Sequence, residues 1–597
     1  MSAPHLQELC HLAWQDEERR LTQLGVSLDQ GCQVLKRFAL LGKEGRHPQN
    51  IARGIQNMLG EPSVPGLVIG KIHMKVERPR DAGQSVQEVD HPLVAPHEYF
   101  SHLYHNCKER FAYLFYGPDS NEDNIEHFWT EVQERQDPRL ENHPILELDN
   151  WKRKVVPLSL HGDGVACVRR GRAGSKTFDA LSYTGTLAYG ATSKTKLFIT
   201  GWLHDCVAQR CPGNNYDSEE ELWGMIIWSF KALDSGKWPT ADWNGAEFPP
   251  DSLDAVRANT DLANGMRAVI WCIKGDLDWY SKALWLRNYN RNDACDFCEA
   301  TVTNADLNMR ALNFGRTCTW KHTLRSPAQW RATTSVMHFL FASLTYLSIW
   351  NVECDDLHVK FQGVYPHMFG SILYLLIFHC MTGSVSDNLE ECWRRILAEH
   401  KSLSIKTQIN KLTFSMFTNP AQPGNDWPML NGRAAEIKHL TKPLRNVWKN
   451  TNPRGNIFRR GVDVCMDMLC EMQDILDSTY RDVFLNIDES ARYRRCVSTS
   501  LLEYVALAGL ADAERRHDPR KPLLFDTIIK LHWMWHAGYK SQYLHPTRSA
   551  CWSDEDYMHL VRDVVQSCVD GTPSHLVPMR FVSRWRWSMH FMNKYDV

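Results

Sequence analysis

Short apolar runs bounded by glycine and polar residues mark the centre of the chain, and this pattern is typical of buried strands. Four such runs stand out: VVPLSLHGDGV (155–165), FDALSYTGTLAYG (178–190), KTKLFITGWL (194–203) and AVIWCIKGD (268–276). Between the third and the fourth, residues 221–233 have the spacing of an amphipathic helix. The pattern predicts three strands, a helix, a fourth strand, and then a helix that begins at Leu277.

Residues 301–530 carry almost no strand pattern and predict an all-helical block. Its helices are predicted at 331–350, 368–378, 388–403, 461–476 and 497–516, with breaks at the proline-rich segment Asn419–Pro428 and the basic segment Lys442–Arg460. A last helix is predicted over 553–568, with Ser553 as its N-cap. The N-terminal part is predicted to be helical over 1–60 and 99–146, with an irregular connection over 61–98.

This order of elements predicts an α/β fold, in which a mixed sheet with flanking helices is interrupted by a large all-α insertion. The predicted segments are a helical N-terminal region that is a candidate for DNA-end binding (1–98), a helical linker or dimerisation region (99–150), the first part of the core (151–300), the insertion (301–530), a segment that returns to the core (531–570) and a basic-aromatic tail (571–597).

The composition is that of an ordinary globular protein, with 43% hydrophobic and 23% charged residues among 597. A net charge of −2 excludes a global electrostatic signature of nucleic-acid binding, so any such surface must be local. Eighteen cysteines in so long a chain do not form a disulfide scaffold, and the N-terminus lacks an apolar signal segment. The longest apolar runs, Met337–Trp350 and Phe369–Cys380, are shorter than a membrane span. We expect a soluble, intracellular protein whose cysteines are thiols or metal ligands.

Two carboxylates follow predicted buried strands, Asp163 after the first and Asp276 after the fourth. A carboxylate in this position is suited to hold a hard cation over the edge of a sheet. Far downstream, Glu555 lies near the start of the last helix. Each has a structural interpretation as well, since Asp is common in turns and acidic residues favour helix N-termini. Asp554 and Asp556 compete with Glu555, and Asp278 competes less well with Asp276.

Two further pairs have the residue types and spacing of a zinc site. Cys295 and Cys298 are half of a tetrahedral site, and His532 and His536, spaced i, i+4, lie on one helix face. Buried thiols and core histidines are the structural alternatives. His358 or His545 could replace one member of the His pair.

The order of these residues resembles that of DDE transposases of the RNase H-like superfamily, and most of all the group of CACTA (En/Spm) transposases, Transib transposases and the catalytic subunit of the V(D)J recombinase. In that group an Asp follows the first strand, a second Asp follows the fourth, a CxxC motif comes next, and a His pair precedes the catalytic Glu. This chain offers Asp163, Asp276, Cys295, Cys298, His532, His536 and Glu555 in that order. DDLHVKFQGVYPHMFG (355–370) also resembles the D-x-[LM]-H…G stretch of CACTA-type proteins.

The resemblance implies an RNase H-like core and a DNA-cleaving, strand-transferring enzyme of the nucleus. Asp163, Asp276 and Glu555 would bind two Mg²⁺ (or Mn²⁺) ions, and Cys295, Cys298, His532 and His536 would share a structural Zn²⁺. The implied partner is double-stranded DNA, both transposon ends and target. Pairing of two ends implies a homodimer or a higher oligomer.

Local basic clusters could supply DNA contacts, although a solvated surface is the simpler interpretation of each. Candidate DNA-binding residues are Arg169, Arg170, Arg172, Lys176, Lys442, Arg445, Lys449, Arg459 and Arg460. Lys152–Lys154, Arg454 and the basic-aromatic segment RFVSRWRW (580–587) are further candidates, and HPQNIARGIQNML (47–59) is a weak candidate for end recognition. Two competing functions remain at this stage: a catalytically inactive, transposase-derived DNA-binding or scaffold protein, and a helical zinc protein unrelated to nucleic acid.

Overall fold

The computed structural model describes the chain except for residues 1–2, 48–50, 52–53, 56–57, 59–61, 78–83, 170–174, 189–192, 212–213, 452–454 and 596–597. The chain divides into two compact units, Met1–Pro65 with Arg584–Tyr595, and Gly66–Ser583. The smaller unit contains α1 (Ala3–Gln23), α2 (Gln33–Ala39), α3 (Leu41–Glu44) and the second half of α22 (Val577–Tyr595). The helices predicted for the start of the chain are therefore present. The segment 47–59 lies largely outside the described residues.

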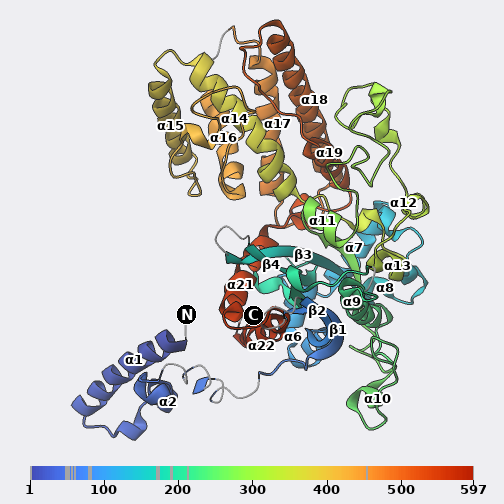
Figure 1. The fold of residues 1–597 in the computed structure, drawn as a ribbon, viewed down its shortest axis with the longest axis vertical. Coiled ribbons are helices and arrows are strands. Elements are labelled where there is room, and N and C mark those ends of the chain that lie inside the picture. The colour runs from blue at the N-terminus through green and yellow to red at the C-terminus, as the bar shows by residue number, and fades with distance from the viewer. Residues whose placement is uncertain are drawn as a thin grey trace. The chain divides into compact units, whose positions relative to one another are not determined.

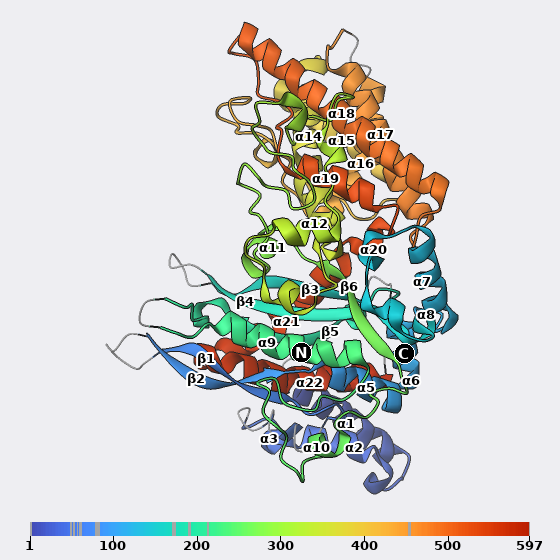
Figure 2. The same cartoon turned by 90° about the vertical axis from the view of Figure 1, so that its right-hand side faces the viewer.

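The larger unit is built on a four-stranded mixed sheet with the strand order β5-β4-β3-β6 (Figure 2). Its strands are β3 (Val155–Arg169), β4 (Ser175–Gly185), β5 (Leu197–Leu203) and β6 (Arg267–Lys274). β3 pairs antiparallel with β4, β4 pairs antiparallel with β5, and β6 pairs parallel with β3. Every residue of β5 is buried, as are all but the first residue of β6. Strands covered on both faces give continuous apolar runs, so the sequence predicted all four.

The first strand extends beyond its predicted end. The prediction that Asp163 follows the first strand is wrong, because β3 continues to Arg169 and Asp163 pairs with Ala180 of β4. β6 accompanies β3 only as far as His161. A Cβ added at Gly162 would collide with the ring of Trp279, so this glycine allows a close approach.

A second departure lies in the segment predicted to be an irregular connection. Residues 61–98 contain a two-stranded antiparallel hairpin, β1 (Val68–Glu77) and β2 (Gln84–Leu93). Ile72 and Met74 are fully buried, whereas His73 between them and Lys71 and Lys75 on either side are not. This alternation is that of a half-buried strand, and the many charged residues obscured it in the sequence.

Helices precede and cover the sheet as predicted. α5 (Pro96–Asn106), α6 (Lys108–Phe115), α7 (Asp123–Glu134) and α8 (Trp151–Lys154) come before β3, and α9 (Ser218–Ser235) and α10 (Leu253–Arg257) lie between β5 and β6. α9 packs against β6, and α21 (Trp552–Val569) packs against β3. α11 (Leu277–Ala283) begins three residues after β6. The expected mixed α/β architecture is confirmed.

The insertion is helical, as predicted. Its helices are α12 (Pro327–Thr333), α13 (Phe339–Ser343), α14 (Tyr365–Leu375), α15 (Val385–Ser402), α16 (Ala434–Thr451), α17 (Arg459–Ser478), α18 (Ile487–His517) and α19 (Lys530–Lys540), followed by α20 (Pro546–Ser549). Figures 1 and 2 show α14–α18 grouped at one end of this unit, with α11 and α19 between them and the sheet. Leu357–Cys380 and Ile487–His517 are long and apolar enough to cross a membrane, but 83% of the first is buried inside the protein, like a core helix.

Three local predictions within the insertion and after it are wrong. The run 331–350 holds only the end of α12, the short α13 and a final 3₁₀ turn, because Ser326 and His338 each start a new helix by capping it. The break predicted over Lys442–Arg460 is shorter than expected: Lys442–Thr451 continues α16 through Pro443, and α17 begins at Arg459. The last helix begins at Trp552, and its N-cap Cys551 forms no side-chain capping bond, so Ser553 is inside the helix.

Candidate functional site

The three predicted acidic residues come together from distant parts of the chain. Asp163 lies on β3, Asp276 caps α11 just after β6, and Glu555 lies in the first turn of α21. Burial and the nearby charges of Glu555 and Asp276 raise the pKa of Asp163 from 3.8 to about 7. The backbones also approach closely, since a Cβ added at Gly275 would lie 3.1 Å from the carbonyl oxygen of Gly162. The structure thus places three carboxylates at one site.

Local backbone bonds orient two of these carboxylates. Gly164 N donates to Asp163 Oδ1 over 2.7 Å, and Trp279 N donates to Asp276 Oδ1 over 2.6 Å. The second bond caps α11, whose N-terminal dipole also favours the negative charge of Asp276. Each bond occupies one carboxylate oxygen and holds the side chain in place.

His358 and Asp355 belong to the same site, and the sequence assigned them no role in it. The His358 imidazole lies between two acids, with Nε2 3.2 Å from Glu555 Oε1 and Nδ1 bonded to Asp355 Oδ2. Burial alone would lower the pKa of His358, but the bonds to Asp355 and Glu555 outweigh it and raise this pKa to about 10. Cys551 N and Leu357 N donate to Asp355, which fixes it in turn. The only sequence signal was the 355–370 stretch of the family resemblance.

Asp554, the first rival of Glu555, is turned into the core. Its carboxylate is buried, with Lys196 Nζ 2.5 Å from Oδ1 and Lys274 Nζ 2.7 Å from Oδ2. Although burial opposes ionisation, the two ammonium groups and His161 hold the pKa of Asp554 well below its usual value. Asp556 is exposed. Glu555 is therefore the acid of this triplet that reaches the site.

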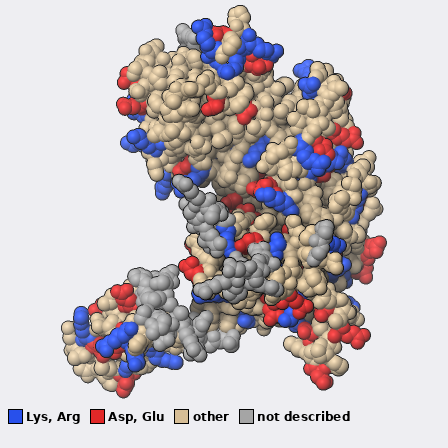
Figure 3. Space-filling model, viewed as in Figure 1, with Lys and Arg blue, Asp and Glu red and all other residues tan. Residues whose placement is uncertain are grey.

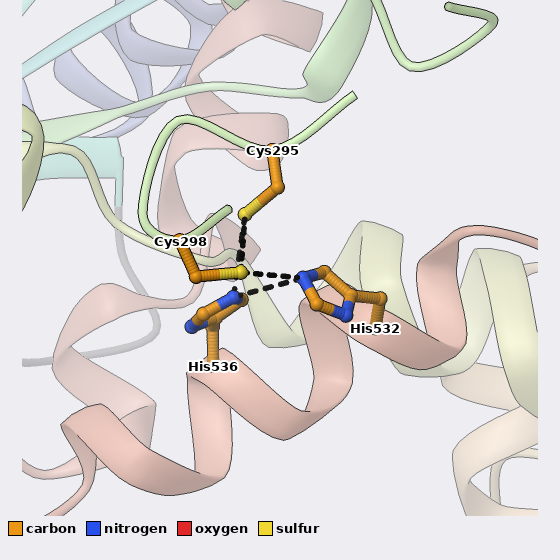
Figure 4. A group of neighbouring side chains, drawn as sticks. All are labelled: Cys295, Cys298, His532 and His536. Carbon is orange, nitrogen blue, oxygen red and sulfur yellow. Dashed lines mark hydrogen bonds between the residues drawn. The ribbon is translucent and has the colours of Figure 1, made fainter. Parts of the chain in front are cut away.

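The second cluster brings both Cys and both His residues together (Figure 4). Cys295 and Cys298 lie on a loop, His532 and His536 lie one turn apart on α19, and all four ligand atoms lie within 4.8 Å of one another. The two sulfurs are 3.6 Å apart, the sulfur–nitrogen distances are 3.3 and 3.4 Å, and the two Nε2 atoms are 3.1 Å apart. In a tetrahedral zinc site, bond lengths of about 2.3 Å to sulfur and 2.0–2.1 Å to nitrogen give about 3.8, 3.5 and 3.3 Å for the same separations. The four residues therefore fit a zinc ion.

The surroundings suit metal ligation. Although burial opposes ionisation, the bond from Cys298 and the two imidazoles hold the pKa of Cys295 well below its usual value, as a thiolate ligand requires. His532 Nδ1 lies 2.9 Å from the carbonyl oxygen of Ala311, which fixes the tautomer that presents Nε2. The buried Arg325 donates to the carbonyl oxygens of Cys295 and Asp296 and so supports the loop.

A chain of contacts joins α19 to the strand that carries Asp276. Lys540 Nζ donates to the carbonyl oxygens of Trp350 and Val352 and lies 3.0 Å from Glu353 Oε2. Glu353 N in turn donates to the carbonyl oxygen of Ile273 on β6. These contacts link α19, the helix that carries the His pair, to β6, the strand that ends just before Asp276. The two rival zinc ligands lie elsewhere, His358 beside Glu555 and His545 beside Thr479.

The predicted DNA-binding residues are mostly engaged in ion pairs. Lys176 pairs with Asp205, Arg445 and Lys449 pair with Asp467, Lys442 pairs with Asp474, and Arg459 lies 3.8 Å from Asp463. Arg460 is exposed. The Arg169 side chain, Arg170, Arg172 and Arg454 lie outside the described residues. Basic and acidic side chains are intermixed on the face shown in Figure 3. DNA contact by these residues stays a prediction.

A cavity of about 610 Å³ opens beside the carboxylates and is lined by Asp163, Asp276, Trp279 and Trp285 among others. Asp278, the rival of Asp276, also lines it but is paired with Lys282 at 2.6 Å. The acidic site is thus accessible from this side. Comparison with known proteins assigns no family, since no protein-family model and no curated protein matches the sequence.

Proposed function

We propose that the protein is a DDE-type transposase that nicks DNA and transfers the freed strand with two divalent cations. The observation that carries the proposal is the convergence of Asp163, Asp276 and Glu555 at one site, where burial and the charges of the other two acids raise the pKa of Asp163 to about 7. Three clustered acids repel one another, and a bound divalent cation relieves that repulsion. The site therefore has the charge and the donor oxygens that Mg²⁺ prefers.

The arrangement of the sheet supports an RNase H-like core. Three consecutive strands pair antiparallel, and β6 joins the first of them in parallel, giving the order β5-β4-β3-β6. Val352 forms a further parallel bridge with Ile273, where a fifth strand of such a core would lie. The acids occupy the central strand, the end of its parallel neighbour and a helix packed on the sheet.

In this function the protein binds and orients, and it needs no nucleophilic side chain of its own. When bound, two cations stabilise charge on the attacking and leaving oxygens of the phosphodiester. Asp163 and Asp276 hold their positions through backbone bonds, and His358 orients Glu555. Water is the attacking group in the nicking step, and the freed 3′-OH is the attacking group in strand transfer.

The Cys/His group has a structural role in the proposal. Cys295, Cys298, His532 and His536 together would hold one zinc ion, and four protein ligands leave no open position for catalysis. The zinc ion would connect the loop before the helical insertion to α19 after it, and so help to position the segment that leads to Glu555. Two DNA ends must be paired in transposition, so we infer a dimer or larger assembly that acts in the nucleus.

The test is a nicking and strand-transfer assay on plasmid DNA with Mg²⁺ or Mn²⁺. Asp276→Asn should lower the rate by about a thousandfold or more, because it removes several kcal/mol of transition-state stabilisation through the metals. Asp278→Asn, two residues further along and paired with Lys282, is the matched control and should retain the rate. Equal rates for Asp276→Asn and the unchanged protein would overturn the mechanism, and so would an unchanged protein that is inactive with both metals.

A further inference from the structure

A second cavity, apart from the one that contains Asp163, lies between the start of α19 and the segments on either side of the two cysteines. It has a volume of about 620 Å³ and is lined by residues 289–292, 302–303, 362–367 and 528–530 in part. The first two segments flank Cys295 and Cys298, and the last leads directly into His532. The Cys/His group therefore joins two walls of this cavity.

Lys530 is one of the residues that line this cavity. It is the first residue of α19, and its ammonium group donates to the carbonyl oxygen of Gln362 over 3.1 Å. Its charge lies close enough to Asp276 and Asp355 to interact with both. An ammonium group in this place can reach an anion held at the carboxylate site.

Gly363 forms the part of the wall that faces the aliphatic part of the Lys530 side chain. A Cβ added at Gly363 would lie 2.6 Å from Lys530 Cδ, so a larger residue there would displace the side chain. The same Cβ would lie 2.9 Å from the carbonyl oxygen of His358, so the wall is close to the histidine that contacts Glu555.

Hydrogen-bond donors line the remaining walls. Arg291 lies at the rim with its side chain 66% exposed, and its Nε lies 3.4 Å from Asp293 Oδ1, which leaves the rest of the guanidinium group open to solvent. His367 lies on the wall formed by α14, with Nδ1 3.4 Å from Asp526 Oδ2. Asn292 accepts from Thr303 N and so joins the two segments that flank the cysteines. Guanidinium, amide, hydroxyl, imidazole and ammonium groups are the donors that proteins direct at phosphate oxygens.

We propose that this cavity binds the sugar-phosphate backbone of the DNA strand that is cut, with Lys530 and Arg291 each contacting a phosphate. The proposal rests on the proposed function, since it takes the scissile phosphate to lie at Asp163, Asp276 and Glu555. It assigns a cation to the site where the sequence motifs offer only acids, and it explains why α19 begins with a lysine that has no acid in hydrogen-bond contact among the described residues.

The test measures binding of the full-length protein to a fluorescently labelled DNA duplex in Ca²⁺ over a series of NaCl concentrations. Lys530→Gln and Arg291→Gln should each weaken binding about threefold to tenfold and reduce the slope of log K against log [NaCl] by about 1, because one phosphate contact is lost. Lys530→Arg should restore most of the slope, and Gly363→Ala should resemble Lys530→Gln.

Lys401→Gln is the matched control, because Lys401 is exposed on α15 in the helical insertion. Zinc content and melting temperature, measured for each variant, exclude simple misfolding. Lys530→Gln and Arg291→Gln proteins that bind with the slope of Lys401→Gln would overturn the proposal, and so would an unchanged protein that does not bind the duplex. Unaltered binding by Lys530→Gln combined with loss of nicking in Asp276→Asn would refute this site and leave the proposed function standing. If Lys530→Gln and Arg291→Gln reduce the slope but the unchanged protein never nicks DNA, the phosphate contacts stand and the proposed function is refuted.

Discussion

The adjacent acids Asp554, Glu555 and Asp556 have three different surroundings. Asp554 is buried between Lys196 and Lys274, Glu555 contacts His358, and Asp556 is exposed. Successive side chains on a helix point in directions about 100° apart, so neighbours cannot share a role. The sequence narrowed the acid to this triplet but could not select it, because the exact start of a helix is set by tertiary contacts.

Asp554→Asn should destabilise the protein by about 3–5 kcal/mol, since it leaves two buried ammonium groups without their carboxylate. Asp556→Asn, at an exposed position of the same turn, should change stability by less than about 0.5 kcal/mol. Glu555→Gln should abolish nicking and leave stability close to that of the unchanged protein. Urea unfolding of the three variants measures these differences. A small loss for Asp554→Asn would contradict the buried ion pairs.

The raised pKa of Asp163 makes both metal binding and stability depend on pH. Because protons compete with the metal, the Mg²⁺ concentration for half-maximal nicking should rise below about pH 7, approaching tenfold per pH unit. Without metal, the stability of the folded protein should instead fall as the pH rises. The folded chain keeps the Asp163 proton up to about pH 7, whereas the unfolded chain releases it near 3.8, so this group makes the protein less stable as pH rises between these values.

Thermal unfolding in a chelator from pH 4.5 to 7.5 measures the stability effect. Asp163→Asn removes the titrating group and should flatten this part of the profile relative to Asp556→Asn, which keeps it. The expectation fails if both variants show the same dependence on pH.

At the scale of elements, α19 is a helix whose side chains contact several separate parts of the candidate site. In one short helix it carries Lys530 toward Asp276, two histidines toward the cysteines, and Lys540 toward the strand edge at Val352. His532, His536 and Lys540 are spaced four residues apart, which places the two histidines on one helix face. The His pair could be predicted from this spacing, but the targets of the lysines could not, because nothing local determines them.

His536→Ala and Cys298→Ser should each reduce bound zinc far below one ion per chain, because three ligands hold the metal much less tightly than four. His545→Ala is the matched control and should keep its zinc, since His545 contacts Thr479 and Thr547 instead. Metal analysis of the purified proteins gives the ratio directly. Full zinc in both ligand variants would exclude a shared site.

Elements differed in how far the sequence predicted them. β5 and β6 were found because both faces are covered and the runs are almost continuously apolar. The hairpin of β1 and β2 was missed, since many of its outward residues are charged and, among the described side chains of β1, the buried apolar ones are Ile72 and Met74. The run 331–350 is apolar yet is broken into short pieces, because apolarity shows that a segment is buried and says little about its backbone.

At the scale of the whole molecule, the candidate site draws its residues from segments spread over most of the chain. The cysteines and the paired histidines could be predicted from their residue types and close spacing. The three acids could be predicted only from their order along the chain, which resembles that of the DDE group. Asp355, His358 and Lys530 have no such signature, since each acts through a partner that folding brings to it. Charge balance was equally uninformative, since a net charge of −2 says nothing about where individual cations lie.

The Cys/His group has one further consequence. With a metal bound to the two cysteines and the two histidines, residues 299–531 would form a loop closed by metal coordination. Glu555 would follow the point of closure in the sequence. The entropy of closing such a loop grows only with the logarithm of its length, so doubling it costs about 0.6 kcal/mol. The exposed turn after Asn419 could thus accept a whole extra domain without moving Glu555. We therefore expect that the length of the insertion can change, in evolution or by engineering, with little effect on the position of Glu555 relative to the other two acids.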